Sequence, residues 1–132
     1  MEFSVDKSYI FPLIFFSLFS CSDSEPLGEI SYNDQIQESI FIFSCSTAAC
    51  HDASSAGGLD LTSYATLIEG STNYASIISA GAAEASPLIW SLEGRDPIGN
   101  PVSIMPPTGR TPITRSEINI IKDWIDQGAK DN

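Results

Sequence analysis

The pattern of apolar positions predicts a helix near the start of the polar part of the chain. Ser31 is a residue suited to capping a helix, and Ile36, Ile40 and Phe43 follow it at helical spacing. This spacing places the three apolar side chains on one face. We therefore expect a first helix that begins after Ser31 and leads to Cys45.

The last helix is the most clearly marked. Thr114 and Glu117 have the spacing of a capping box, in which each side chain binds the backbone N–H of the other residue. Gly128 marks the end of the helix. The apolar stripe between these signals consists of Ile118, Ile121, Trp124 and Ile125.

Two shorter helices are predicted between them. One has Thr62 as its cap, turns Leu67 and Ile68 inward and stops at Gly70. The other covers residues 86–94 (SPLIWSLEG), with a capping Ser, Pro at its first position and Gly at its end. Residues 71–85 show no clear period, and no segment keeps a period of two. The predicted fold class is therefore all-α with long loops.

Residues 95–112 form the longest of these loops. Five prolines and two glycines in this stretch exclude a regular helix or a central strand. A long loop in a small domain is usually functional or disordered. Met105 lies inside it, in the sequence IMPPTG.

The N-terminal segment reads as an export signal. Residues 10–20 are almost all apolar, which is too short for a spanning helix of about 20 residues but typical of a signal-peptide core. They lead into residues 18–21 (LFSC), which resemble a bacterial lipobox with Cys21 as the lipidated residue. We assign 1–20 to the signal peptide, 21–30 to lipidated Cys21 and a flexible tether, and 31–132 to one domain. The alternative is a plain secretory signal in which Cys21 has no role.

Charge excludes one class of partner. With 17 acidic and 6 basic residues the formal net charge is -11, so the chain has no basis for binding a phosphate backbone. The 42% hydrophobic content is that of a folded domain. Three Cys, two Met and one His are its scarce residues. Removal of the signal and lipidation of Cys21 would leave Cys45, Cys50, His51 and Met105.

The sequence CSTAACH, residues 45–51, carries the candidate chemistry. Two cysteines, the second followed at once by His, are what covalent haem attachment requires, because both thiols add to the haem and the adjacent imidazole becomes an axial ligand. Here four residues separate Cys45 from Cys50. Met105, in its proline-restricted loop, is the candidate for the second axial ligand.

Three other interpretations remain open on the residues alone. Cys45 and Cys50 can form a disulfide in a haem-free exported protein used for binding or scaffolding. A zinc site can use both cysteines and His51, with a carboxylate such as Asp52 as fourth ligand. A haem can also be present with an open sixth position for ligand or peroxide chemistry.

Four further residues are candidates for contact with haem carboxylates. Trp90 and Trp124 have indole N–H donors, but both lie at helical spacing typical of a core. Arg95 and Arg110 flank Met105 and are equally well explained as solvated surface charges.

The order of these motifs resembles that of class I c-type cytochromes, in particular small exported monohaem cytochromes and lipoproteins of bacteria. The matching segments are CSTAACH at 45–51, GLDLTSYATL at 58–67, SPL at 86–88, MPP at 105–107, and WI followed by GA at 124–129. The resemblance covers roughly residues 30 to 130. It implies a cytochrome c-like helical domain whose first and last helices cross beside a covalently bound haem.

On this resemblance we expect an electron carrier, not an enzyme, with one haem c per chain. Cys45 and Cys50 would be the thioether anchors, with His51 and Met105 as iron ligands. We expect transient contacts with redox partner proteins and no nucleic acid. The expected location is the cell envelope or periplasmic side of a bacterial membrane, reached through a lipid anchor.

The lipid anchor predicts a simple labelling result. Cells fed radiolabelled palmitate should label the wild-type chain but not the Cys21→Ser variant, because the acyl groups are attached through that residue. Labelling that persists in Cys21→Ser would refute acylation at this position.

Overall fold

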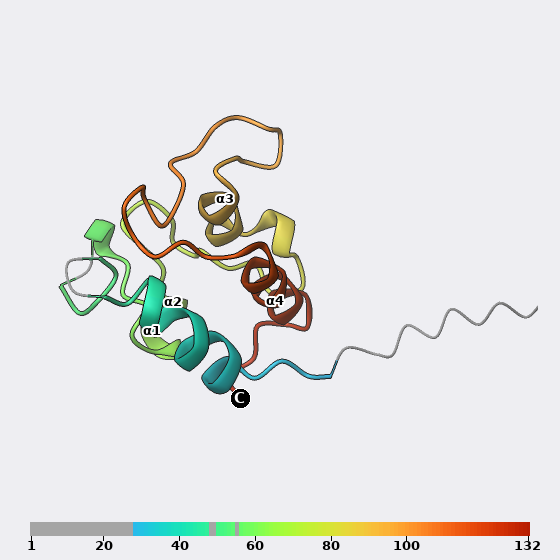
Figure 1. The fold of residues 1–132 in the computed structure, drawn as a ribbon. Helices are drawn as coiled ribbons and strands as arrows, with labels where there is room; N and C mark the ends of the chain where they lie inside the picture. Colours follow the sequence, from blue (N-terminus) through green and yellow to red (C-terminus); the bar gives the residue numbers. More distant parts are fainter. Residues whose placement is uncertain (1–27, 48–49, 55) are drawn as a thin grey trace, which may run out of the picture.

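The computed structural model describes residues 28–47, 50–54 and 56–132, arranged as Figure 1 shows. In these residues there is no strand, and one isolated bridge joins Arg95 to Pro101. The predicted all-α fold class is confirmed. The helices are η1 (a π-helix, Tyr32–Phe41), α1 (Ile42–Ser44), η2 (a 3-10 helix, Ala56–Gly58), α2 (Tyr64–Glu69), η3 (a 3-10 helix, Ala83–Ala85), α3 (Pro87–Glu93) and α4 (Arg115–Asp126).

The first predicted helix is present as η1 and α1. The Ser31 hydroxyl oxygen accepts a hydrogen bond of 3.2 Å from the backbone N–H three residues later, and Ile36 and Ile40 are buried. The prediction for Phe43 is wrong, because its side chain is 64% exposed while Phe41 is fully buried. The hydrogen bonds of a π-helix span five residues and widen the turn, so the buried face continues at residues 40 and 41.

Aromatic packing holds the first helix against the last. The ring centroid of Tyr32 lies 5.3 Å from that of Trp124 and 5.2 Å from that of Tyr64. Phe41 meets the same tyrosine edge-on at 6.5 Å. Tyr32 and Trp124 are each only 1% exposed, so the contact forms the centre of the core.

The helix α2 begins one residue later than predicted. Its cap is Ser63, whose hydroxyl oxygen accepts from the backbone N–H of residue 66. Thr62 instead donates its hydroxyl to the carboxylate of Asp60 at 2.6 Å. Leu67 is buried as expected, but Ile68 is 44% exposed, which corrects that prediction. A helix of six residues buries one narrow stripe, and Leu67 occupies it.

The helix α3 has the predicted bounds, but the predicted side-chain cap is absent. Pro87 takes the first position, and Gly94 ends the helix in a left-handed conformation with φ 71°. The Ser86 side chain does not cap it. Its buried hydroxyl accepts from the N–H of Ser79 at 2.9 Å and donates to the carbonyl of Ala82 at 3.2 Å. Ser86 thus ties the preceding loop to the start of α3.

The helix α4 matches its prediction throughout. Both bonds of the capping box are present: the Thr114 hydroxyl accepts from the Glu117 N–H, and the Glu117 carboxylate accepts from the Thr114 N–H. The buried residues of the helix are Ile118, Ile121, Trp124 and Ile125.

The two ends of the described chain meet (Figure 1). Ile30 is buried, its N–H donates to the Gln127 side chain at 2.8 Å, and Lys130 pairs with Glu29 at 2.6 Å. Residues 28–30, assigned from sequence to the tether, therefore contact the folded domain. The predicted signal peptide and Cys21 lie outside the described residues. Within the described ranges, no helix combines the length and apolar character needed to cross a membrane.

Gly70 and Gly81 form a matched pair for testing how close packing around a glycine affects the free energy of unfolding. Their φ angles are 83° and 79°, but an added Cβ would lie 2.6 Å from the Ala75 carbonyl oxygen at Gly70 and meet nothing within 4 Å at Gly81. Gly81→Ala should lower the free energy of unfolding by about 1 kcal/mol, the cost of the left-handed conformation. Gly70→Ala should lower it by at least about 3 kcal/mol, because steric overlap adds to strain. Urea denaturation measures both, and equal losses would contradict the close approach at Gly70.

Candidate functional site

The domain contains an open cavity of about 380 Å³, within the size range of cofactor sites. Its lining comes from four stretches of chain, residues 44–61, 71–77, 87–92 and 105–110. Most of the side chains in it are apolar, including Leu59, Leu61, Ile77, Leu88 and Leu92.

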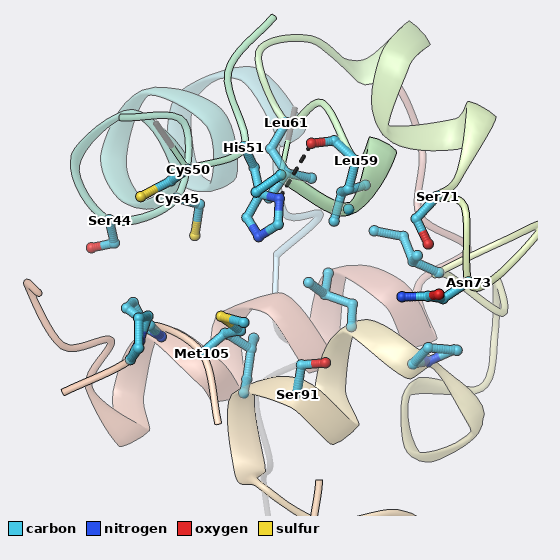
Figure 2. Close-up of a pocket in the computed structure, with 18 of the residues that line it drawn as sticks. Ser44, Cys45, Cys50, His51, Leu59, Leu61, Ser71, Asn73, Ser91 and Met105 are labelled. Carbon is cyan, nitrogen blue, oxygen red and sulfur yellow. Dashed lines mark hydrogen bonds between the residues drawn. The ribbon is translucent and has the colours of Figure 1, made fainter. Parts of the chain in front are cut away.

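His51 is held by one ring nitrogen and presents the other. Its Nδ1 lies 3.2 Å from the carbonyl oxygen of Leu59. A carbonyl only accepts hydrogen bonds, so in the neutral ring Nδ1 carries the proton and Nε2 keeps its lone pair. Figure 2 shows Nε2 facing the cavity. Such a second bond orients a metal-binding imidazole and fixes its tautomer.

Cys45 and Cys50 lie beside His51 at one end of the cavity (Figure 2). The end of the first helix positions Cys45, whose N–H donates to the Phe41 carbonyl at 2.8 Å. The chain then turns back, and the His51 N–H donates to the Cys45 carbonyl at 3.1 Å. Both cysteines are free thiols, Cys45 buried and Cys50 half-buried. Burial raises the pKa of the Cys45 thiol to about 12, and negative charge on Cys50 and Glu117 acts in the same direction.

Met105 lies across the cavity from His51 (Figure 2). Its backbone N–H donates to the carbonyl of Ser91 on α3 at 2.8 Å, which attaches the long loop to a helix. Pro106 and Pro107 follow it in the cavity wall. The Met105 side chain is 37% exposed, so the cavity opens to solvent near this residue.

An ion-pair network attaches α3 to α4. The Glu93 side chain is only 5% exposed, and its carboxylate accepts from Lys122 at 2.6 Å, from Arg115 at 3.5 Å and from Arg95. Burial acts to lower the pKa of Lys122, but its hydrogen bonds to Glu84 and Glu93 outweigh this and raise it. Lys122 therefore stays charged in a position with 18% side-chain exposure.

The structure brings together four of the five residues predicted for the site. Cys45, Cys50, His51 and Met105 all line the same cavity. The fifth, Cys21, lies outside the described residues.

The four further candidates for contact with haem carboxylates differ in their partners and in whether they line the cavity. The indole N–H groups of Trp90 and Trp124 donate to backbone carbonyls at 2.8 and 2.9 Å, and neither side chain lines the cavity. Arg95 is held by Glu93. Arg110 does line the cavity, and its guanidinium has no ion pair with any residue the structure describes.

The sequence did not identify the polar residues Ser71 and Asn73, which also line the cavity. Their segment shows no periodicity and contains no motif, so no signal marked them. Across the described parts of the chain, no cluster of three or more His, Cys, Asp or Glu side chains is arranged to hold a metal ion.

Comparison with known proteins adds one match. Residues 48–109, which include Cys50, His51 and Met105, match a protein family described as planctomycete cytochrome C. The match starts after Cys45 and covers just under half of the chain. No curated protein and no solved structure matches. The family match supports a cytochrome c-like domain, and at that general level it indicates haem-based electron transfer and an exported protein.

Proposed function

We propose that this protein is an electron carrier that holds one haem c through Cys45 and Cys50, with His51 and Met105 as the axial iron ligands. The observation that carries the proposal is the convergence of these four side chains on one cavity, although Met105 lies far along the chain from the other three.

The chemistry of the donor set fits the group. Two thiols sit beside an imidazole at one end of the cavity, and a thioether lies on the opposite wall. The apolar lining suits a large, flat, hydrophobic ring. When bound, the haem supplies reversible exchange of one electron between ferrous and ferric iron.

The protein's own residues prepare the site for that role. The Leu59 carbonyl keeps the proton on Nδ1 of His51, which leaves Nε2 free to bind iron and makes it a better donor. The hydrogen bond from the Met105 N–H to the Ser91 carbonyl holds Met105 on the cavity wall opposite His51. His and Met ligation in an apolar pocket favours a comparatively high reduction potential.

The proposal extends to the setting of the protein. Redox proteins would meet the domain in transient contacts at the surface of a bacterial membrane, to which lipidated Cys21 would anchor it. The palmitate labelling described above tests this anchor separately from the haem.

Covalent attachment predicts a spectroscopic and an extraction result. Protein made in cells with a c-type haem attachment system should show a Soret band and keep its haem through acid-acetone extraction. The double variant Cys45→Ala, Cys50→Ala should lose covalent haem completely, because both thioether bonds are gone. Cys21→Ser serves as the control and should keep it. A wild-type chain that shows no Soret band, or releases its haem to acid-acetone, contradicts the proposal.

The axial ligand predicts a second result. Ferric iron bound to a thioether sulfur has a weak absorption band at the red end of the visible spectrum, and Met105→Ala should abolish it entirely. The same variant should have a lower reduction potential, since Met ligation raises it. Ile104→Ala, at an exposed neighbour, should keep both properties. If the wild type lacks the band, an open sixth position becomes the better account.

A further inference from the structure

The cavity has a polar end that the proposed function does not use. Figure 2 shows Ser71 and Asn73 at the end opposite Cys45 and Cys50, with His51 between. All five side chains line the same cavity. The thiol end also carries the Ser44 hydroxyl, and the opposite end carries the Ser71 hydroxyl and the Asn73 amide.

The backbone around these two residues is fixed in position. Thr72, which lies between them, anchors the segment: its backbone N–H and its hydroxyl both donate to the carbonyl of Gly57, at 3.1 and 2.6 Å. The Ser71 N–H donates to the Tyr74 carbonyl at 2.8 Å, which closes the turn. The base of the turn passes so close to Gly70 that no Cβ fits there.

The donor groups of both side chains are available. The Ser71 hydroxyl oxygen accepts from the Tyr74 N–H at 3.1 Å, which leaves its proton free to donate. The Asn73 amide is exposed and makes no hydrogen bond with any residue the structure describes.

This inference rests on the proposed function. The vinyl groups of a haem, which react with cysteine thiols, lie at one edge of the ring, and its two carboxylates lie at the opposite edge. Attachment to Cys45 and Cys50 would therefore direct the carboxylates toward the other end of the cavity. Carboxylates taken out of water need hydrogen-bond donors.

Cations are scarce in this acidic chain and mostly engaged. Three of them bind Glu93, and Lys130 binds Glu29. We propose that Ser71 and Asn73 donate hydrogen bonds to the haem carboxylates and thereby hold that edge of the haem in the cavity.

The test uses the haem-loaded protein with the haem carboxylates labelled with ¹³C, so that their infrared bands are distinguished from those of Asp and Glu. Asn73→Ala and Ser71→Ala should each shift the labelled carboxylate stretch, because one hydrogen bond is lost. Asn73→Gln, which keeps the amide, should restore the wild-type band at least in part. Asn119→Ala is the matched control, since this exposed asparagine on α4 does not line the cavity.

A second measurement tests how an added negative charge changes the reduction potential. Asn73→Asp places a negative group beside the carboxylates and should lower the reduction potential, whereas Asn119→Asp should leave it close to wild type. Both positions are exposed, so both variants should fold.

The outcomes separate this inference from the proposed function. Bound haem with the same carboxylate band in every variant overturns the role of Ser71 and Asn73 and leaves electron transfer standing. A shift in Arg110→Gln alone would place the carboxylates at the Met105 loop and also overturn it. A wild-type chain without covalent haem, and so without labelled bands, overturns both proposals together.

Discussion

The structure depends on the packing of Tyr32 against Trp124, which holds η1 and α4 together. These helices carry the two sides of the cavity. η1 continues into α1, Cys45 and His51, while α4 supports α3 and, through the Ser91 carbonyl, the Met105 loop. The aromatic contact lies outside the cavity lining, while Leu61, Ile77, Leu88 and Leu92 belong both to the core and to the cavity wall. The contact between Tyr32 and Trp124, neither of which lines the cavity, sets the separation of the two walls.

Ion pairs attach α3, which forms part of the second cavity wall, to α4. The buried Glu93 carboxylate is surrounded by Lys122, Arg95 and Arg115, which come from α4 and from the start of the long loop. Removal of one partner from such a buried network is costly because the remaining charges lose their compensation. A chain with 6 basic residues commits half of them here. These three residues thus stabilise the wall that carries Met105.

The sequence predicted those features that depend on residues close together in the chain. The capping box of α4, Pro87 at the start of α3 and the adjacency of Cys50 and His51 are readable within a few residues. Phe43 was misplaced because the predicted spacing was that of an α-helix, whereas the wider turn of the π-helix η1 places Ile40 and Phe41 on the buried face. The sequence did not separate the roles of Arg95 and Arg110. Glu93, two residues before Arg95, pairs with it, but the place of Arg110 in the cavity wall depends on how the long loop folds. Ser71 and Asn73 were missed because their place in the cavity depends on the fold, in which Thr72 binds the Gly57 carbonyl 15 residues away.

The contact between the start of η1 and Asn132 has a consequence for the order of folding. The Ser31 hydroxyl and the backbone N–H groups of Tyr32 and Asn33 donate to Asn132, across as many as 101 residues of sequence. Contacts between such distant residues form slowly, because a long loop must close first. The start of η1 is thus completed only when the last residues arrive. Cys45 is buried in the finished domain, so its thiol is open to chemical reaction only before folding is complete.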